Sequence, residues 1–200
     1  MDNIQMDNIQ EYKQSLKHHW ENAKSVVFYI LGLIGFPAYM IYRFGWEDST
    51  VFIRYALIGF SVFLIPQLIL HIRYYYINRG YIFYYYPQEL KIKIRTTTGE
   101  ETEFYFDDIK QVYYVKSFPQ AENRMQWLAT DSYSFARIYL KNGKQFLITS
   151  LIIPNMNLPL EKEKIRISKT FYAYPLTKER PLKELKKKPI KEEKQYRNFY

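Results

Sequence analysis

Two long runs without charge, close to the N-terminus, place the strongest constraint on what this chain can fold into. Ser25–Tyr42 and Tyr55–Ile72 contain no Asp, Glu, Lys or Arg, and Val51–Ile53 can extend the second run. A helix of about 18 residues is about 27 Å long, close to the thickness of the hydrocarbon core of a bilayer. The sequence therefore predicts two transmembrane helices, residues 25–42 and 51–72, which pair as a helical hairpin.

Two other interpretations of these runs have to be weighed. A pair of buried helices in a soluble core would normally keep a polar stripe, and neither run has one. The first run is also not typical of a cleaved signal peptide, because a long polar segment (residues 1–24) precedes it and no small-residue cleavage site follows it. We therefore expect retained anchors. The opening MDNIQMDNIQ is a duplication, so Met6 is an alternative start.

The basic residues that flank the runs predict the orientation of the hairpin. Lysines precede the first run and basic residues follow the second, whereas the connecting segment, residues 43–54, carries two basic and two acidic residues. Because basic flanks favour the cytoplasmic side, we expect both termini in the cytoplasm. The flanking residues are Lys13, Lys17, Lys24, Arg73, Arg79 and Lys91.

From Tyr81 onward the hydrophobic pattern changes to a period of two, which is typical of antiparallel strands. Glu89–Arg95 reads ELKIKIR and predicts Leu90, Ile92 and Ile94 on one face of a half-buried strand. Further on, Asn142-Gly143 separates two strand-like runs and predicts a two-residue type I′ hairpin turn. We expect six or seven antiparallel strands between Tyr81 and Ile153, with Ser117–Ser132 as the least regular segment.

This order of parts resembles a known group of proteins. A two-helix hairpin followed by Tyr81–Pro87, Glu89–Arg95, Phe104–Lys116 and Arg137–Ile153, the last reading RIYLKNGKQFLITSLII, is similar to the bacterial two-transmembrane-helix proteins with a C-terminal pleckstrin-homology-like (PH-like) domain. The resemblance implies an α+β membrane protein with a cytosolic PH-like domain over residues 80–174. It also implies the bacterial cytoplasmic (inner) membrane as the location and a non-enzymatic adaptor as the role.

The region after Pro154 departs from that group. Its fold ends in an amphipathic helix, and no clean helical pattern follows Pro154. Leu160–Ile167 could form a short helix, or Ile165, Ile167 and Phe171-Tyr172 could form an extra strand. Residues 175–200 are rich in proline and charge, which predicts a flexible basic tail.

The basic tail is the candidate contact for anionic lipid. It supplies most of the chain's net charge of +9, and basic groups near a membrane surface contribute about 1 kcal/mol each. Interspersed glutamates weaken this attraction, so a merely solvated tail is the alternative. The candidate contact residues are Lys183, Lys186, Lys187 and Lys188.

The sequence carries no recognisable catalytic or cofactor signature. The absence of cysteine excludes disulfides and thiolate chemistry. His18, His19 and His71 lack a metal-site spacing, so we expect His18 and His19 to form a solvated pair at the membrane interface and His71 to lie at an interfacial helix end. The pairs Glu100-Glu101 and Asp107-Asp108 are typical of turns and surface charge rather than of an acid/base couple. We therefore predict no enzyme activity, no catalytic residue, no cofactor and no metal.

The same features limit the partners. Tyrosines beside basic groups could stack on nucleic-acid bases, but after an apolar helix they are more typical of an interfacial belt, so no nucleic acid and no small-molecule substrate are expected. The preferred hypothesis is a membrane-anchored adaptor that binds a protein partner or the anionic bilayer surface. The alternative is a small accessory or regulatory subunit of a membrane transporter or other membrane complex, acting through its hairpin.

Overall fold

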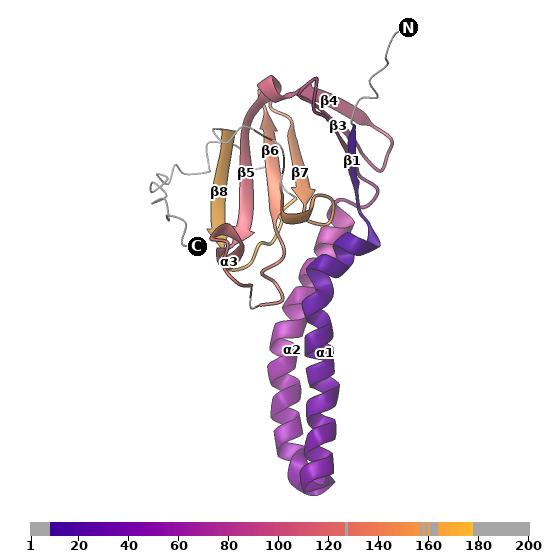
Figure 1. Ribbon diagram of the computed structural model, residues 1–200, viewed down its shortest axis with the longest axis vertical. Helices are drawn as coiled ribbons and strands as arrows, with labels where there is room; N and C mark the ends of the chain where they lie inside the picture. The colour runs from indigo at the N-terminus through magenta and orange to yellow at the C-terminus, as the bar shows by residue number, and fades with distance from the viewer. Residues whose placement is uncertain (1–8, 127, 157, 159, 161–163, 178–200) are drawn as a thin grey trace, which may run out of the picture.

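The computed structural model describes residues 9–177 apart from positions 127, 157, 159 and 161–163. Two helices project as a long hairpin from one end of a β-module (Figure 1). Helix α1 spans Leu16–Phe44 and helix α2 spans Trp46–Ile77. Both helices are long and apolar enough to cross a membrane. They extend beyond the predicted runs, and Gly45 alone connects them, so the predicted connecting segment over residues 43–54 is wrong.

Most apolar residues of the hairpin are not buried in a protein core. None of the most hydrophobic stretch of α1 is buried, and only 11% of that of α2 is. This exposure does not fit the interpretation as core helices of a soluble domain. The helices pack on each other: the Tyr29 and Phe63 rings stack, and Gly32 lies so close to Phe60 that a β-carbon would come within 2.6 Å of the ring.

The β-module consists of two sheets. The first sheet is antiparallel in the order β1-β2-β3-β4, with β1 Gln10–Lys13, β2 Ile82–Tyr86, β3 Lys91–Arg95 and β4 Glu101–Tyr105. The second has the order β7-β6-β5-β8, with β5 Ile109–Ser117, β6 Phe135–Leu140, β7 Gln145–Thr149 and β8 Ile165–Thr170. Short helices η1 (Phe106–Asp108), α3 (Phe118–Ala121) and η2 (Pro154–Met156) complete the described elements.

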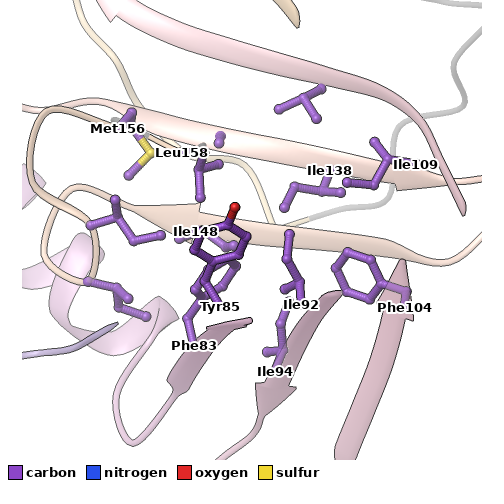
Figure 2. Packing of buried hydrophobic residues seen from close by; sticks show 14 of the residues in the cluster. Phe83, Tyr85, Ile92, Ile94, Phe104, Ile109, Ile138, Ile148, Met156 and Leu158 are labelled. Atoms are coloured by element: carbon purple, nitrogen blue, oxygen red, sulfur yellow. The ribbon is translucent and has the colours of Figure 1, made fainter. Parts of the chain in front are cut away.

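The main core lies between the two sheets. Figure 2 shows Phe83, Ile92 and Phe104 of the first sheet pointing toward Ile138 and Ile148 of the second. After β7 the chain crosses this interface and adds Met156 and Leu158 to the same cluster. Such a two-layer arrangement buries the apolar face of each sheet against the other.

Six strands lie between Tyr81 and Ile153, as predicted, and two more come from outside that range. Strand β1 pairs with β2 antiparallel. From its sequence the segment before the hairpin is expected only to be polar, but part of it belongs to the sheet. Strand β8 pairs with β5 in parallel, which settles the alternatives for Leu160–Ile167 in favour of a strand from Ile165. The described residues thus form eight strands in two sheets, and the expectation of a purely antiparallel module is wrong for β8.

Two local predictions need correction. Asn142-Gly143 does join antiparallel strands, but the loop has three residues: the Gly143 amide donates to the Leu140 carbonyl, and the Leu140 amide donates to the Lys144 carbonyl. Only Gly143 has positive φ, +88°, which is a type I turn with a bulge rather than a type I′ turn. Leu90 is half exposed in the turn before β3, whereas Ile92 and Ile94 are buried as predicted.

Candidate functional site

The polar side chains of the hairpin gather where it meets the β-module, and we call this region the junction. It consists of the first turns of α1, the last turns of α2 and three segments of the module: residues 132–134, 147–151 and 172–173. An apolar cluster supports the junction: Leu70, Tyr74, Tyr133, Phe135, Leu151 and Ala173. The junction combines this apolar cluster with a set of buried and partly buried hydrogen bonds.

A chain of ring contacts crosses the junction from α1 to the module. His19 Nδ1 lies 3.1 Å from His71 Nε2, and His71 Nδ1 lies 2.8 Å from the Tyr133 hydroxyl. The side chain of Tyr133 is fully buried, and burial raises the pKa of its phenol, so the hydroxyl stays protonated at neutral pH. When both imidazoles are neutral, each ring has one donor and one acceptor nitrogen. The donors along the chain then all point the same way, either from Tyr133 toward His19 or from His19 toward Tyr133. The contact between the two rings requires at least one of them to be neutral, because two imidazolium rings would place N–H against N–H.

The start of α1 is tied to the module by a second group of bonds centred on Asn22. Its amide nitrogen donates to the His18 carbonyl at 2.8 Å, and its Oδ1 accepts from the Ser150 hydroxyl at 2.9 Å. The Ser132 hydroxyl donates to the Asn22 carbonyl at 2.9 Å. His18 Nδ1 lies 3.1 Å from the Leu151 carbonyl. Asn22, only 4% exposed, thus links two loops of the module to one turn of helix.

The end of α2 is held in the same way. Asn78 donates to the Leu147 carbonyl at 2.8 Å and accepts from the Thr149 amide at 2.8 Å, so one side chain extends the edge of β7. The Tyr74 hydroxyl donates to the Ala173 carbonyl at 2.7 Å. The Tyr172 hydroxyl donates to the Pro66 carbonyl at 2.8 Å. With bonds of this kind on both helices, the module has one defined orientation on the hairpin.

The prediction that His18 and His19 form a solvated pair is wrong. All three histidines contact a partner far away in the sequence, and each partner lies outside the helix that carries the histidine. A signal was present, because a pair of histidines next to a helix start and a single histidine at the end of an apolar run can meet once the helices pair. These contacts could not be predicted from the sequence, because the partners Leu151 and Tyr133 are far away along the chain and belong to no recognisable motif.

The acidic pairs have local structural roles. The Asp108 carboxylate accepts from the Tyr105 amide at 2.9 Å and closes the turn at η1. Glu101 lies 2.7 Å from Lys93 across the β3–β4 pair, and a hydrogen bond from Lys93 lowers the pKa of its carboxyl group. Among the described residues, no three His, Cys, Asp or Glu side chains are grouped so that they could hold a metal ion. The four lysines Lys183, Lys186, Lys187 and Lys188 lie outside the residues that the structure describes.

Comparison with protein families gives one match. The PH domain family matches residues 11–159, about three quarters of the chain. The chain belongs to the PH domain family. The matched residues of this PH domain include most of β1 and both helices of the hairpin as well as β2–β7. No curated protein and no solved structure gives a significant match.

Membership of the PH domain family fits the architecture and gives the class of function. PH domains are typically non-catalytic modules that bind lipids or proteins. The two packed sheets of this PH domain share one apolar core. Strand β8 occupies the position beside β5, the edge of the second sheet.

Proposed function

We propose that this protein is a non-enzymatic adaptor whose helical hairpin crosses a lipid bilayer and holds the PH domain at the membrane surface. One observation carries the proposal: few of the apolar side chains in the most hydrophobic stretches of the two helices are buried in the protein. Of the apolar side chains, Phe28, Ile34, Ile58 and Val62 are more than 60% exposed. Soluble monomers rarely expose contiguous apolar patches beyond about 600 Å². An apolar surface that runs along two long helices is therefore expected to contact lipid or another protein.

The spacing of aromatic residues on the hairpin fits contact with a bilayer. Trp20 and Tyr39 on α1 are exposed and, at 1.5 Å per residue, about 28 Å apart; Tyr55 and Tyr76 on α2 are exposed and about 31 Å apart. Aromatic belts at both interfaces of a bilayer of about 30 Å have this separation. Lys24 and Arg54 lie within or beside these limits, and their long side chains can reach the headgroups.

In the adaptor hypothesis the PH domain binds a protein partner or the anionic bilayer surface. The junction supports this role because it fixes how the domain stands on the hairpin, so a binding face keeps a constant angle to the membrane. By the basic flanks, both termini lie in the cytoplasm. We place the protein in the inner membrane of a bacterium, as the resemblance implies.

The second candidate, an accessory subunit of a membrane complex, rests on small residues of the hairpin. A β-carbon added at Gly35 or Gly59 would meet nothing within 4 Å, so these positions lie open to another helix. Small residues allow close helix contacts in membranes. Capture of multi-span proteins that is lost in a Gly35→Leu, Gly59→Leu variant would favour this candidate, whereas capture of soluble partners would favour the adaptor.

Extraction of membranes at alkaline pH tests the anchor. After carbonate washing, the full-length chain is expected in the membrane pellet, together with an established integral protein. Release into the supernatant, together with a peripheral control, would contradict the proposal. The full chain is required, because a fragment that starts at residue 80 lacks β1 and the junction helices.

A further inference from the structure

An open apolar edge lies at the end of the PH domain from which the hairpin projects. We call it the apolar edge and define it by Phe118, Met125, Leu128 and Phe171. These side chains, with Arg124 and Asp131, surround a cavity of about 540 Å³ between α3, the loop after it and the end of β8. Met125 and Phe171 are 72% and 75% exposed. Figure 1 shows α3 and the end of β8 at the end of the domain from which the hairpin projects.

Two hydrogen bonds fix the depth of this region along the hairpin. Tyr172, next to Phe171, donates to the carbonyl of Pro66, which lies about six residues or 9 Å before Ile72 within the second apolar run. Ser132, in the segment that leads from the cavity to β6, donates to the carbonyl of Asn22, one turn into α1 beyond His18. Both anchor points lie on the bilayer side of the level marked by His19 and His71.

The apolar surface continues from this region onto the hairpin. A groove of about 470 Å³ runs along α2 and is lined by Leu57, Ile58, Ser61, Val62, Ile65 and Pro66. It ends at Pro66, where Tyr172 is bound. The same medium that covers the groove therefore reaches the segment that carries Phe171.

The charged groups around the apolar edge match the interface of a bilayer. Arg73 lies over the Tyr174 ring at 5.8 Å, and Lys169 and Arg124 both pair with Glu122 beside the cavity. Cationic and aromatic side chains of this kind collect at the headgroup level of membranes. Beside the cavity the charges balance, with Arg124 and Lys169 against Glu122 and Asp131.

From these observations we infer that the apolar edge is immersed in the headgroup region of the bilayer that the hairpin crosses, with lipid filling the cavity. The PH domain would then rest on the membrane along a second contact besides its helices, and it could not stand free above the surface. This inference rests on the proposed transmembrane hairpin.

Depth measurements with spin labels separate the two claims. The chain has no cysteine, so single cysteines can be introduced at Met125, Phe171, Val62 and Tyr105 in the full-length protein in phospholipid vesicles. Val62 lies in the groove of α2, and Tyr105, 53% exposed, lies at the end of β4 away from the hairpin. At each site the collision rates of the label with oxygen and with a water-soluble nickel complex are compared.

Labels at 125 and 171 are expected to give oxygen-to-nickel ratios between those at 62 and 105, and the label at 105 is expected to favour the nickel complex. If 62 lies in lipid but either 125 or 171 is as accessible to nickel as 105, the inference is overturned and the hairpin stands. If 62 is itself accessible to nickel, the transmembrane hairpin fails and the inference fails with it.

Discussion

His71 Nδ1 lies 2.8 Å from the hydroxyl of Tyr133, and this contact joins the end of the second apolar helix to the β-module. The two residues are separated by 62 positions in the sequence. Their rings meet edge to face, and Tyr133 also packs edge to face on Tyr74. The contact is therefore both a hydrogen bond and part of the apolar support of the junction.

Removing the Tyr133 hydroxyl should weaken the junction. Tyr133→Phe leaves His71 Nδ1 without its partner at a half-buried site, which costs about 1–2 kcal/mol of unfolding free energy. Thermal unfolding of the full chain in detergent should show a lower midpoint. Tyr105→Phe is the matched control, because its hydroxyl is on an exposed residue. Equal midpoints for the two variants would contradict the structural role of the contact.

The turn after β6 provides a test of the fold. Gly143 has φ of +88°, so Gly143→Val should lower the unfolding free energy by about 1–3 kcal/mol, since a β-branched residue resists positive φ. Gly143→Asn should cost much less, because asparagine tolerates this conformation. Similar losses for Val and Asn, measured by denaturant unfolding, would argue against the three-residue loop.

The segment before the hairpin should contribute to stability through β1. Tyr12 packs edge to face on Phe83 at 5.9 Å, so a chain without residues 1–14 loses a strand and part of the core, at an expected cost of about 2–4 kcal/mol. A chain that starts at Met6 keeps Gln10–Lys13 and should match the full-length protein. Unfolding midpoints of the three chains check this, and an unchanged midpoint without β1 would show that the strand adds nothing.

Acid should weaken the β3–β4 pair through Glu101. Its carboxyl pKa is lowered by the hydrogen bond from Lys93, so the folded state binds a proton less readily than the unfolded state. The contribution is present above the ordinary pKa of a glutamate and is lost as pH falls through the lowered value. NMR titration should return the pKa to the ordinary range in Lys93→Gln. A pKa that does not move would mean that the pair is not formed in solution.

The basic tail should respond to salt if it contacts lipid. With a dye on Tyr200→Cys in the otherwise cysteine-free chain, energy transfer to headgroup dyes in nanodiscs should be higher with anionic than with neutral lipid. It should fall at high salt, because the Debye length shrinks from about 10 Å at 0.1 M to about 3 Å at 1 M. Changing Lys186, Lys187 and Lys188 to Gln should abolish most of the difference. Energy transfer that depends neither on the lipid charge nor on the three substitutions would show that the tail is solvated and does not contact lipid.

The features readable from the sequence are those set by local pattern. The alternation in Glu89–Arg95 places Ile92 and Ile94 in the core, as the structure confirms, and the two apolar runs lie within the two helices. The prediction for Leu90 is wrong because this residue has a positive φ, +48°, and lies in the turn before the strand, so the alternation begins only at Lys91. A period of two cannot signal such a break.

The features that the sequence does not reveal depend on distant partners. A strand is one of two alternatives for the segment that forms β8, but its parallel pairing with β5 requires a return path that no pattern encodes. The junction is hidden for the same reason: Asn22, His71 and Asn78 look like ordinary polar residues until the helices and loops are brought together. Their burial is visible only in three dimensions.

The central claim, a hairpin that crosses a bilayer, is tested most directly by labelling from each side of the membrane. Glu47→Cys, at the start of α2 and at the tip of the hairpin, and Glu100→Cys, before β4, give two single-cysteine proteins. A maleimide that cannot cross membranes should label the Glu47→Cys protein on intact cells and label the Glu100→Cys protein only after the membrane is opened. Labelling of both proteins, or of neither, on intact cells would contradict a hairpin that spans the bilayer.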